Sequence, residues 1–167
     1  ALLSHAGQEK SFADANDEYG DPVRLKLPLS MGLRVIAAHI ATTGRNQGIP
    51  NFQRILPLFE QYPNLYTDIS SLTQFNKLGY INKALLDERL RGRLIYGSDY
   101  PLINMVLVSP FYFPLNLTME QMSGIKKIDN PFQRDLQLKQ ALGVSDDIFR
   151  RSGELLNIPP QKSVEIQ

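Results

Sequence analysis

Four short apolar segments alternate with longer amphipathic segments along this chain. The apolar segments are rich in leucine, isoleucine and valine, which is typical of strands buried on both faces of a sheet. Because a helical segment separates each strand from the next, we expect parallel pairing through right-handed crossovers. The predicted strands, in their expected spatial order, are 1–4, 34–38, 65–69 and 94–96.

The segments between and after these strands carry helix start and stop signals. Asp21 and Pro22 begin a first helix, which Pro28 should keep short or kinked because proline lacks a backbone N–H. Asn51 should cap the next helix, and Pro57 should interrupt it. The remaining predicted helices are 52–61, 75–86, 119–127, 131–142 and 146–156, the last two with Asn130 and Ser145 as caps.

The number of strand–helix units bears on the domain organisation. Four such units are half of an eight-unit barrel, and the chain opens at Ala1, without a methionine, inside a predicted strand. We therefore expect a fragment of a longer α/β protein, a parallel (βα)4 half of a TIM barrel followed by C-terminal helices. Residues 1–158 form the predicted domain and residues 159–167 a tail. The outer strands of such a sheet should be covered, because bare edges promote aggregation.

Composition and charge narrow the function classes. The net charge is +1, from 18 basic and 17 acidic residues, which gives no electrostatic support for a nucleic acid or a membrane partner. The apolar run 103–117 is broken by polar residues and prolines, and it is shorter than the ~20 residues that a spanning helix needs. The absence of cysteine excludes thiolate ligands and disulfides. With no visible signal peptide, we predict a cytoplasmic protein.

Three chemically useful side chains stand at the C-terminal ends of predicted strands. His5 follows the first strand and His39 the second, and these are the two histidines of the chain. Asp99 follows the fourth strand, in the segment RLIYGSDYPL at 93–102. In α/β barrels and open α/β sheets, these strand ends carry the active site. Taken singly, each residue is more often structural; together they predict one cleft.

The same segments resemble a known family. HAG at 5–7, AAH at 37–39, LYTDIS at 65–70 and RLIYGSDYPL at 93–102 are similar to the last four strands of the amidohydrolase superfamily. NPFQRDLQLKQALGV at 130–144 is similar to the C-terminal helix of its amidohydrolase-related branch of TIM-barrel metal-dependent hydrolases. The resemblance covers nearly the whole chain, from Leu2 to Leu156, and implies strands five to eight of the barrel.

The resemblance implies roles for the strand-end residues. The fifth and sixth strands of the family each supply a metal-binding histidine, which match His5 and His39. The eighth strand supplies an aspartate that binds metal or takes a proton from the attacking water, which matches Asp99. The family's first strand carries an H-x-H pair, which this chain lacks because both histidines are already used. We expect a divalent metal, Zn²⁺, in the parent protein, and an inactive fragment.

The function classes that follow differ in their chemistry. The first is a metal-dependent hydrolase that cleaves a C–N or C–O bond of a small amide, ester or lactone with a metal-activated water. The second is a non-oxidative decarboxylase on the same scaffold, which needs a cation for the substrate carboxylate. The third is a non-catalytic half-barrel that associates with itself. The expected partners are a small-molecule substrate and either a second copy or the N-terminal half of the same protein.

Three further polar residues carry weaker signals. Arg45 and Glu9 are candidate substrate contacts, although charged loop residues are more often solvated. Asp68 lies inside the third strand, where a buried carboxylate bonded to a neighbouring loop is expected ahead of a catalytic role.

Overall fold

The computed structural model describes residues 1–8 and 16–158, and a four-stranded parallel sheet lies at its centre. The strand order is β1-β2-β5-β6, and each neighbouring pair is parallel, as the sequence predicts. The strands are β1 (Leu2–Ser4), β2 (Val35–Ala37), β5 (Leu65–Asp68) and β6 (Leu94–Ile95). The fold class is therefore α/β with a parallel sheet.

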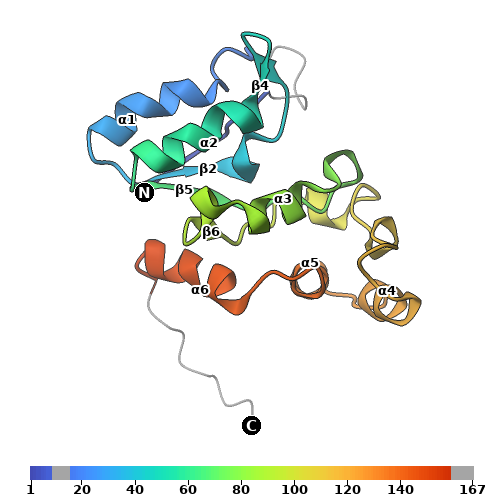
Figure 1. The fold of residues 1–167 in the computed structure, drawn as a ribbon. Helices are drawn as coiled ribbons and strands as arrows, with labels where there is room; N and C mark the ends of the chain where they lie inside the picture. The colour runs from blue at the N-terminus through green and yellow to red at the C-terminus, as the bar shows by residue number, and fades with distance from the viewer. Residues whose placement is uncertain (9–15, 159–167) are drawn as a thin grey trace.

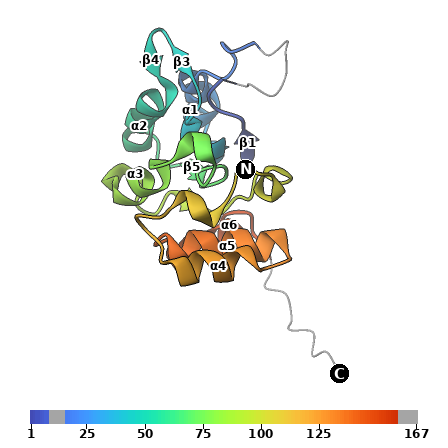
Figure 2. The ribbon, with the colours of Figure 1, turned by 90° about the vertical axis from the view of Figure 1, so that its right-hand side faces the viewer.

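The helices lie on both sides of this sheet. Figures 1 and 2 show α1 and α2 on one side and α5 and α6 on the other. The helices are α1 (Lys26–Ser30), α2 (Asn51–Gln61), α3 (Tyr80–Leu86), α4 (Met119–Lys126), α5 (Pro131–Ala141) and α6 (Asp146–Leu155). Short 3₁₀ helices span Pro22–Leu25, Phe75–Lys77, Glu88–Leu90, Leu102–Asn104 and Pro110–Tyr112, and a tight turn that contains left-handed residues spans Ala38–Ala41.

Alternating strand residues divide the core between the two sides. Val35 and Leu65, fully buried, belong to the large cluster that includes Ile55 and Phe59 of α2. Their neighbours along the strands point the other way, and Ile36 packs with Ile95 and with Leu155 of α6 in a smaller cluster. This period of two explains the continuous apolar runs, because both faces of the sheet are covered.

Three of the predicted helix caps stand at the predicted residue, and one is corrected. The carboxylate of Asp21 accepts a bond from the Val23 N–H, and the Asn130 side chain accepts from the first turn of α5. Asn51 is instead the first residue of α2; it is buried, and its amide donates to the Thr43 carbonyl at 3.0 Å. Ser145 is the N-cap of α6 as predicted, but its side chain makes no capping bond.

Three connecting segments differ from their predictions. α2 runs through the exposed Pro57 without interruption. The predicted helix 75–86 is split into a 3₁₀ helix and α3 at Gly79, whose φ is 85°. The predicted loop 41–50 contains a hairpin of β3 (Arg45–Asn46) and β4 (Ile49–Pro50). Its two turn residues, 47 and 48, both have positive φ, as a tight two-residue hairpin requires.

The two outer strands of the sheet differ in how far they are covered. α6 packs along β6, where the Tyr96 N–H donates to the Ile148 carbonyl at 3.1 Å. At the opposite edge, Leu2 and Leu3 of β1 are 42% and 65% exposed. Across residues 1–8 and 16–158, no helix is long and apolar enough to cross a membrane. The domain boundary at residue 158 remains a prediction, and the proposed tail lies outside the described residues.

Candidate active site

The end of β2 carries His39 in an unusual backbone conformation. His39 and Ile40 have φ values of 39° and 53°, in the left-handed region that β-branched residues such as isoleucine rarely adopt. Two side chains of β5 hold this turn: Asp68 accepts the His39 N–H at 2.9 Å, and Thr67 accepts the Ile40 N–H at 3.0 Å. These buried bonds offset the backbone strain and direct the His39 side chain. Asp68 is therefore a buried carboxylate bonded to a neighbouring loop, the environment expected from the sequence.

His39 faces His5 across the ends of β2 and β1. The Nε2 atom of His39 lies 3.3 Å from the Nδ1 atom of His5, and the rings meet edge to face at 69°. His39 is 5% exposed, whereas His5 is exposed. Two nitrogen ligands of a tetrahedral zinc, each at 2.0–2.1 Å, also lie ~3.3 Å apart. The spacing therefore suits either an imidazole–imidazole hydrogen bond or two neighbouring metal ligands.

Asp99 follows β6 and has a φ of 60°, a conformation that aspartate tolerates better than most residues. The Ser71 hydroxyl and the Gln74 side-chain amide both donate to its Oδ2 atom, the amide from 3.4 Å. Its backbone carbonyl accepts the Leu102 N–H at 2.8 Å. The loop after β5 therefore fixes the orientation of this half-buried carboxylate.

The three predicted side chains share one cavity of about 240 Å³ at the C-terminal ends of the strands. Strand ends on one face of a parallel sheet converge in this way in barrels and open sheets. The lining comprises His5, Gln8, His39, Thr43, Ser71, Gln74, Asn76, Lys77, Asp99, Leu102 and Leu107. The sequence thus located the cavity from its strand ends.

Several lining residues carry no prediction from the sequence. Among them are the buried polar residues Ser71, Gln74 and Lys77, which are 4%, 4% and 6% exposed. These residues are spaced three apart, and this spacing is a signal that can be read in the sequence. The Gln74 N–H donates to the Ser71 carbonyl, and the Lys77 N–H donates to the Gln74 carbonyl, at 3.0 and 2.9 Å. Such turns place every third residue on one face. Polar residues at this spacing, just after a buried strand, indicate a lined cavity.

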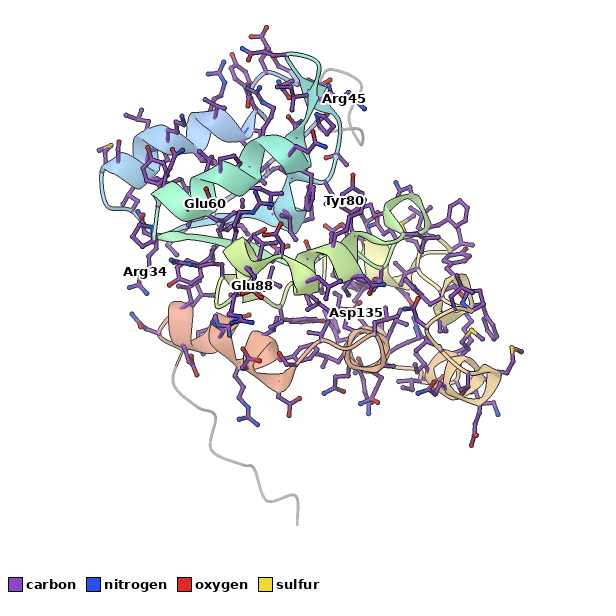
Figure 3. All side chains as sticks on the ribbon, viewed as in Figure 1. Arg34, Arg45, Glu60, Tyr80, Glu88 and Asp135 are labelled. Atoms are coloured by element: carbon purple, nitrogen blue, oxygen red, sulfur yellow. The ribbon has the colours of Figure 1, made fainter. Side chains whose placement is uncertain are left out.

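Of the two predicted substrate contacts, the structure describes Arg45 and places it outside the cavity lining. Arg45 is exposed in the β3–β4 hairpin, at the top of Figure 3, where its guanidinium donates to the Gly48 carbonyl at 3.0 Å. It is not among the residues that line the cavity, so the geometry gives its assignment no support. Glu9 lies outside the described residues.

The fit of this site to a metal is partial. The His5–His39 spacing suits two ligands, and the buried Nδ1 atom of His39 has no hydrogen-bond partner among the described residues. However, within the described part of the chain no three histidine, cysteine or acidic side chains are grouped so that they could hold a metal ion. Asp99 faces the same cavity, but Ser71 and Gln74 bind its carboxylate. Two histidines therefore provide half of a site.

The charge state of His39 favours ligation. Burial, together with the positive charge of Lys77 and the proximity of His5, lowers the pKa of His39 from 6.5 to about 3. The imidazole is therefore neutral at physiological pH and keeps a lone pair for a metal or a proton. Metal binding needs this form, because a protonated ring has no free lone pair.

The same pKa predicts how stability depends on pH in the metal-free chain. The unfolded chain binds the His39 proton near pH 6.5, and the folded chain only near pH 3. Above pH 6.5 the ring is neutral in both states, and the free energy of unfolding is not reduced by its protonation. As pH falls from 6.5 towards 3, the unfolded chain takes up the proton first and the free energy of unfolding decreases. We expect a slope of up to about 1.4 kcal/mol per pH unit in this window. Urea unfolding in a chelating buffer measures it. The free energy of unfolding of the wild type, relative to that of His39→Gln, should fall on acidification, because glutamine does not titrate. A constant difference between the two would contradict the prediction.

Comparison with known proteins places this geometry in a family. Residues 12–107, more than half of the chain, match the family model described as Amidohydrolase. The chain belongs to the amidohydrolase family. The matched region of this amidohydrolase contains His39 and Asp99, whereas His5 precedes it. The family resemblance drawn from the strand-end motifs is thus confirmed.

A solved structure from Pseudomonas putida, described as a candidate 2-pyrone-4,6-dicarboxylic acid hydrolase, is also similar to this amidohydrolase. The two share 18% sequence identity with a TM-score of 0.48, over 84% of this chain and 49% of the other. The chain therefore spans about half the length of that protein. No curated protein matches this chain.

Proposed function

We propose that this chain carries half of the active site of a metal-dependent hydrolase that cleaves a C–N or C–O bond of a small amide, ester or lactone. One observation carries the proposal: His39 and His5 lie 3.3 Å apart at adjacent strand ends, over a cavity that Asp99 also lines. Membership of the amidohydrolase family supports the reaction class for the parent protein.

The histidines supply the metal-binding part of this proposal. His5 and His39 would hold a divalent metal, with Zn²⁺ the best match to two imidazole nitrogens. When bound, such a metal lowers the pKa of water and polarises a carbonyl group. The resemblance to the family assigns the remaining ligands to an H-x-H pair on the first strand of the barrel. On this proposal the parent protein binds zinc tightly, and the present chain binds it more weakly.

Asp99 is the proton acceptor of the proposed reaction. Its Oδ2 atom is held by Ser71 and Gln74, and on this proposal the other carboxylate oxygen accepts a hydrogen bond from a water in the cavity. A carboxylate held in this way accepts a proton from the attacking water and returns it to the leaving group. Lys77, which lines the same cavity, adds a positive charge that stabilises the negative charge developing on the substrate.

The exposed edge of the sheet suggests how the parent protein is completed. β1 is an outer strand, and its Leu2 and Leu3 leave apolar surface exposed. On our proposal these strands are the fifth to eighth of a barrel, and the N-terminal half of the same protein pairs with β1 and covers this edge. Pairing of two copies through β1 is the alternative, and the mass of the purified chain in solution separates the two.

Decarboxylation on the same scaffold has one observation in its favour. A carboxylate substrate needs a cation, and Lys77 lines the cavity whereas Arg45 does not. Lys77 therefore takes over the role for which the sequence offered only Arg45. Products distinguish the reactions, because hydrolysis releases an acid and consumes water, whereas decarboxylation releases carbon dioxide.

Zinc titration of the purified chain tests the proposal. We expect one Zn²⁺ per chain in competition with a chromophoric chelator, and a tenfold or greater loss of affinity on replacing either His5 or His39 by alanine, since each supplies one ligand. Glu120→Gln, an exposed change in α4, serves as the control and should match the wild type. Zinc binding that survives both histidine replacements, or no binding by the wild-type chain, would overturn the zinc assignment.

A further inference from the structure

A buried ion pair in α5 lies directly behind the end of β6. Lys139 is fully buried, and its ammonium donates to Asp135 at 2.7 Å and to the Gly97 carbonyl at 2.9 Å. The Tyr96 hydroxyl donates to the same Asp135 oxygen at 2.9 Å. Figure 3 shows Asp135 on the inner side of α5, towards α3. Lysine and aspartate are almost never this buried unless paired.

Such a pair is a poor way to stabilise a core. Removing two charges from water costs several kcal/mol per ion, and apolar residues of similar volume often do as well or better. Lys139 is flanked by the buried Leu138 and Leu142, so an apolar side chain would suit this position. Stability alone therefore does not explain the pair. The bond from the ammonium to Gly97 connects α5 to the end of β6, beside the cavity.

Gly97 connects the pair to the other strand ends. Its carbonyl bonds to Lys139, and a Cβ atom at this position would approach the Asp68 side chain to 3.0 Å, so β6 and β5 are in close contact here. Asp68 in turn accepts the His39 N–H at 2.9 Å. Gly97 also stands two residues before Asp99. A continuous series of contacts thus runs from α5 through β6 and β5 to the turn that carries His39.

The electrostatics connect the same groups. Burial lowers the pKa of Lys139, and the charges of Asp135, Asp68 and Asp99 oppose that shift. The buried cation and these carboxylates therefore attract one another. The buried cation therefore influences the cavity by its charge and by its bond to Gly97.

We propose that Lys139 is a positioning residue of the active site, whose bond to the Gly97 carbonyl fixes the end of β6 and with it the place of Asp99 beside the two histidines. This inference rests on the proposed metal-dependent function. Asp135 and the Tyr96 hydroxyl hold the ammonium in place, so the unit spans two residues of α5 and the end of β6. Outer groups of this kind orient the residues that touch a metal and tune its binding.

The test removes the pair without leaving a buried charge. In the double variant Lys139→Met/Asp135→Leu, zinc affinity by chelator competition should fall by about 10–100-fold, the usual loss when an outer partner of a metal site is removed. A second measurement follows hydrogen exchange of the Leu102 N–H, which donates to the Asp99 carbonyl. The reference is the Val35 N–H of β2, which donates to the Asn64 carbonyl and is measured in the same sample. The ratio of the Leu102 exchange rate to the Val35 rate should be at least tenfold higher in the double variant than in the wild type.

Leu138→Ala is the matched control, because Leu138 is 1% exposed and is the immediate neighbour of Lys139 in α5. It should lower the thermal midpoint while leaving zinc affinity and the exchange ratio unchanged. Lys139→Gln, which keeps a donor for Gly97, should lose less affinity than Lys139→Met, and it replaces the double variant if that variant does not fold. Equal losses in Leu138→Ala and the double variant, or wild-type values in the double variant, would overturn the inference. If the wild-type chain binds no zinc, the proposed function fails, and the exchange ratio alone decides the role of Lys139.

Discussion

Replacing Asp99 by asparagine in the parent protein should lower kcat by roughly 10²–10⁴-fold if Asp99 is the general base that we propose, because a positioned general base contributes about this factor. The fold should persist. Asparagine tolerates the φ of 60° at this position, and its side-chain oxygen still accepts the Ser71 hydroxyl bond. Steady-state turnover, bound metal and thermal midpoint, measured on the same preparation, separate loss of the base from loss of the metal or of the fold.

The control for this prediction is an exposed carboxylate on the same chain. Asp129, in the connection between α4 and α5, is exposed, and Asp129→Asn should leave kcat and the thermal midpoint at wild-type values. An Asp99→Asn variant that retains wild-type turnover would remove Asp99 from the mechanism. Equal effects at both positions would point to a general charge effect, since neither carboxylate would then act from inside the cavity.

Replacing Lys139 by methionine should destabilise the chain by about 3–5 kcal/mol, the usual consequence of removing one partner of a buried ion pair. The physical reason is the carboxylate that remains. Asp135 is 2% exposed, and without the ammonium its Oδ2 atom keeps the Tyr96 hydroxyl as its partner among the described residues. Urea unfolding followed by circular dichroism measures the change in the free energy of unfolding, which should exceed that of any single exposed substitution in α5.

Removing the second charge should restore most of this loss. The double variant Lys139→Met/Asp135→Leu has no buried ion to desolvate, and its apolar side chains suit the space beside Leu138. Lys126→Met, an exposed lysine in α4, is the matched control and should stay within about 0.5 kcal/mol of the wild type. A Lys139→Met variant as stable as that control would show that the ammonium is dispensable for folding.

The distinction between stability and positioning matters for this site. If the double variant recovers stability but still binds zinc poorly, the buried pair is retained for the cavity rather than for the fold. The geometry favours that outcome, because Lys139 bonds to Gly97 and Gly97 packs on Asp68, which holds the backbone of His39. Both strand ends would then depend on a single cation in α5.

The sequence by itself determined the sheet and the position of the cavity. Apolar runs separated by helical segments specify parallel strands, and a parallel sheet brings the residues after each strand to one end. For this reason the positions of the strands along the chain are enough to group His5, His39 and Asp99. The caps at Asp21 and Asn130 are also local signals, since each side chain bonds within its own first turn.

Only the tertiary structure decided how the cavity is built. The left-handed turn at His39 depends on bonds from Thr67 and Asp68, which lie 27 and 29 residues away along the chain from the N–H groups that they accept. Lys139 reaches Gly97 across 42 residues. No local pattern encodes these contacts, because hydrogen bonds between distant segments exist only once the strands and α5 have packed. Strand periodicity sets which residues meet at the end of the sheet, whereas long-range polar bonds set their orientation and their charge.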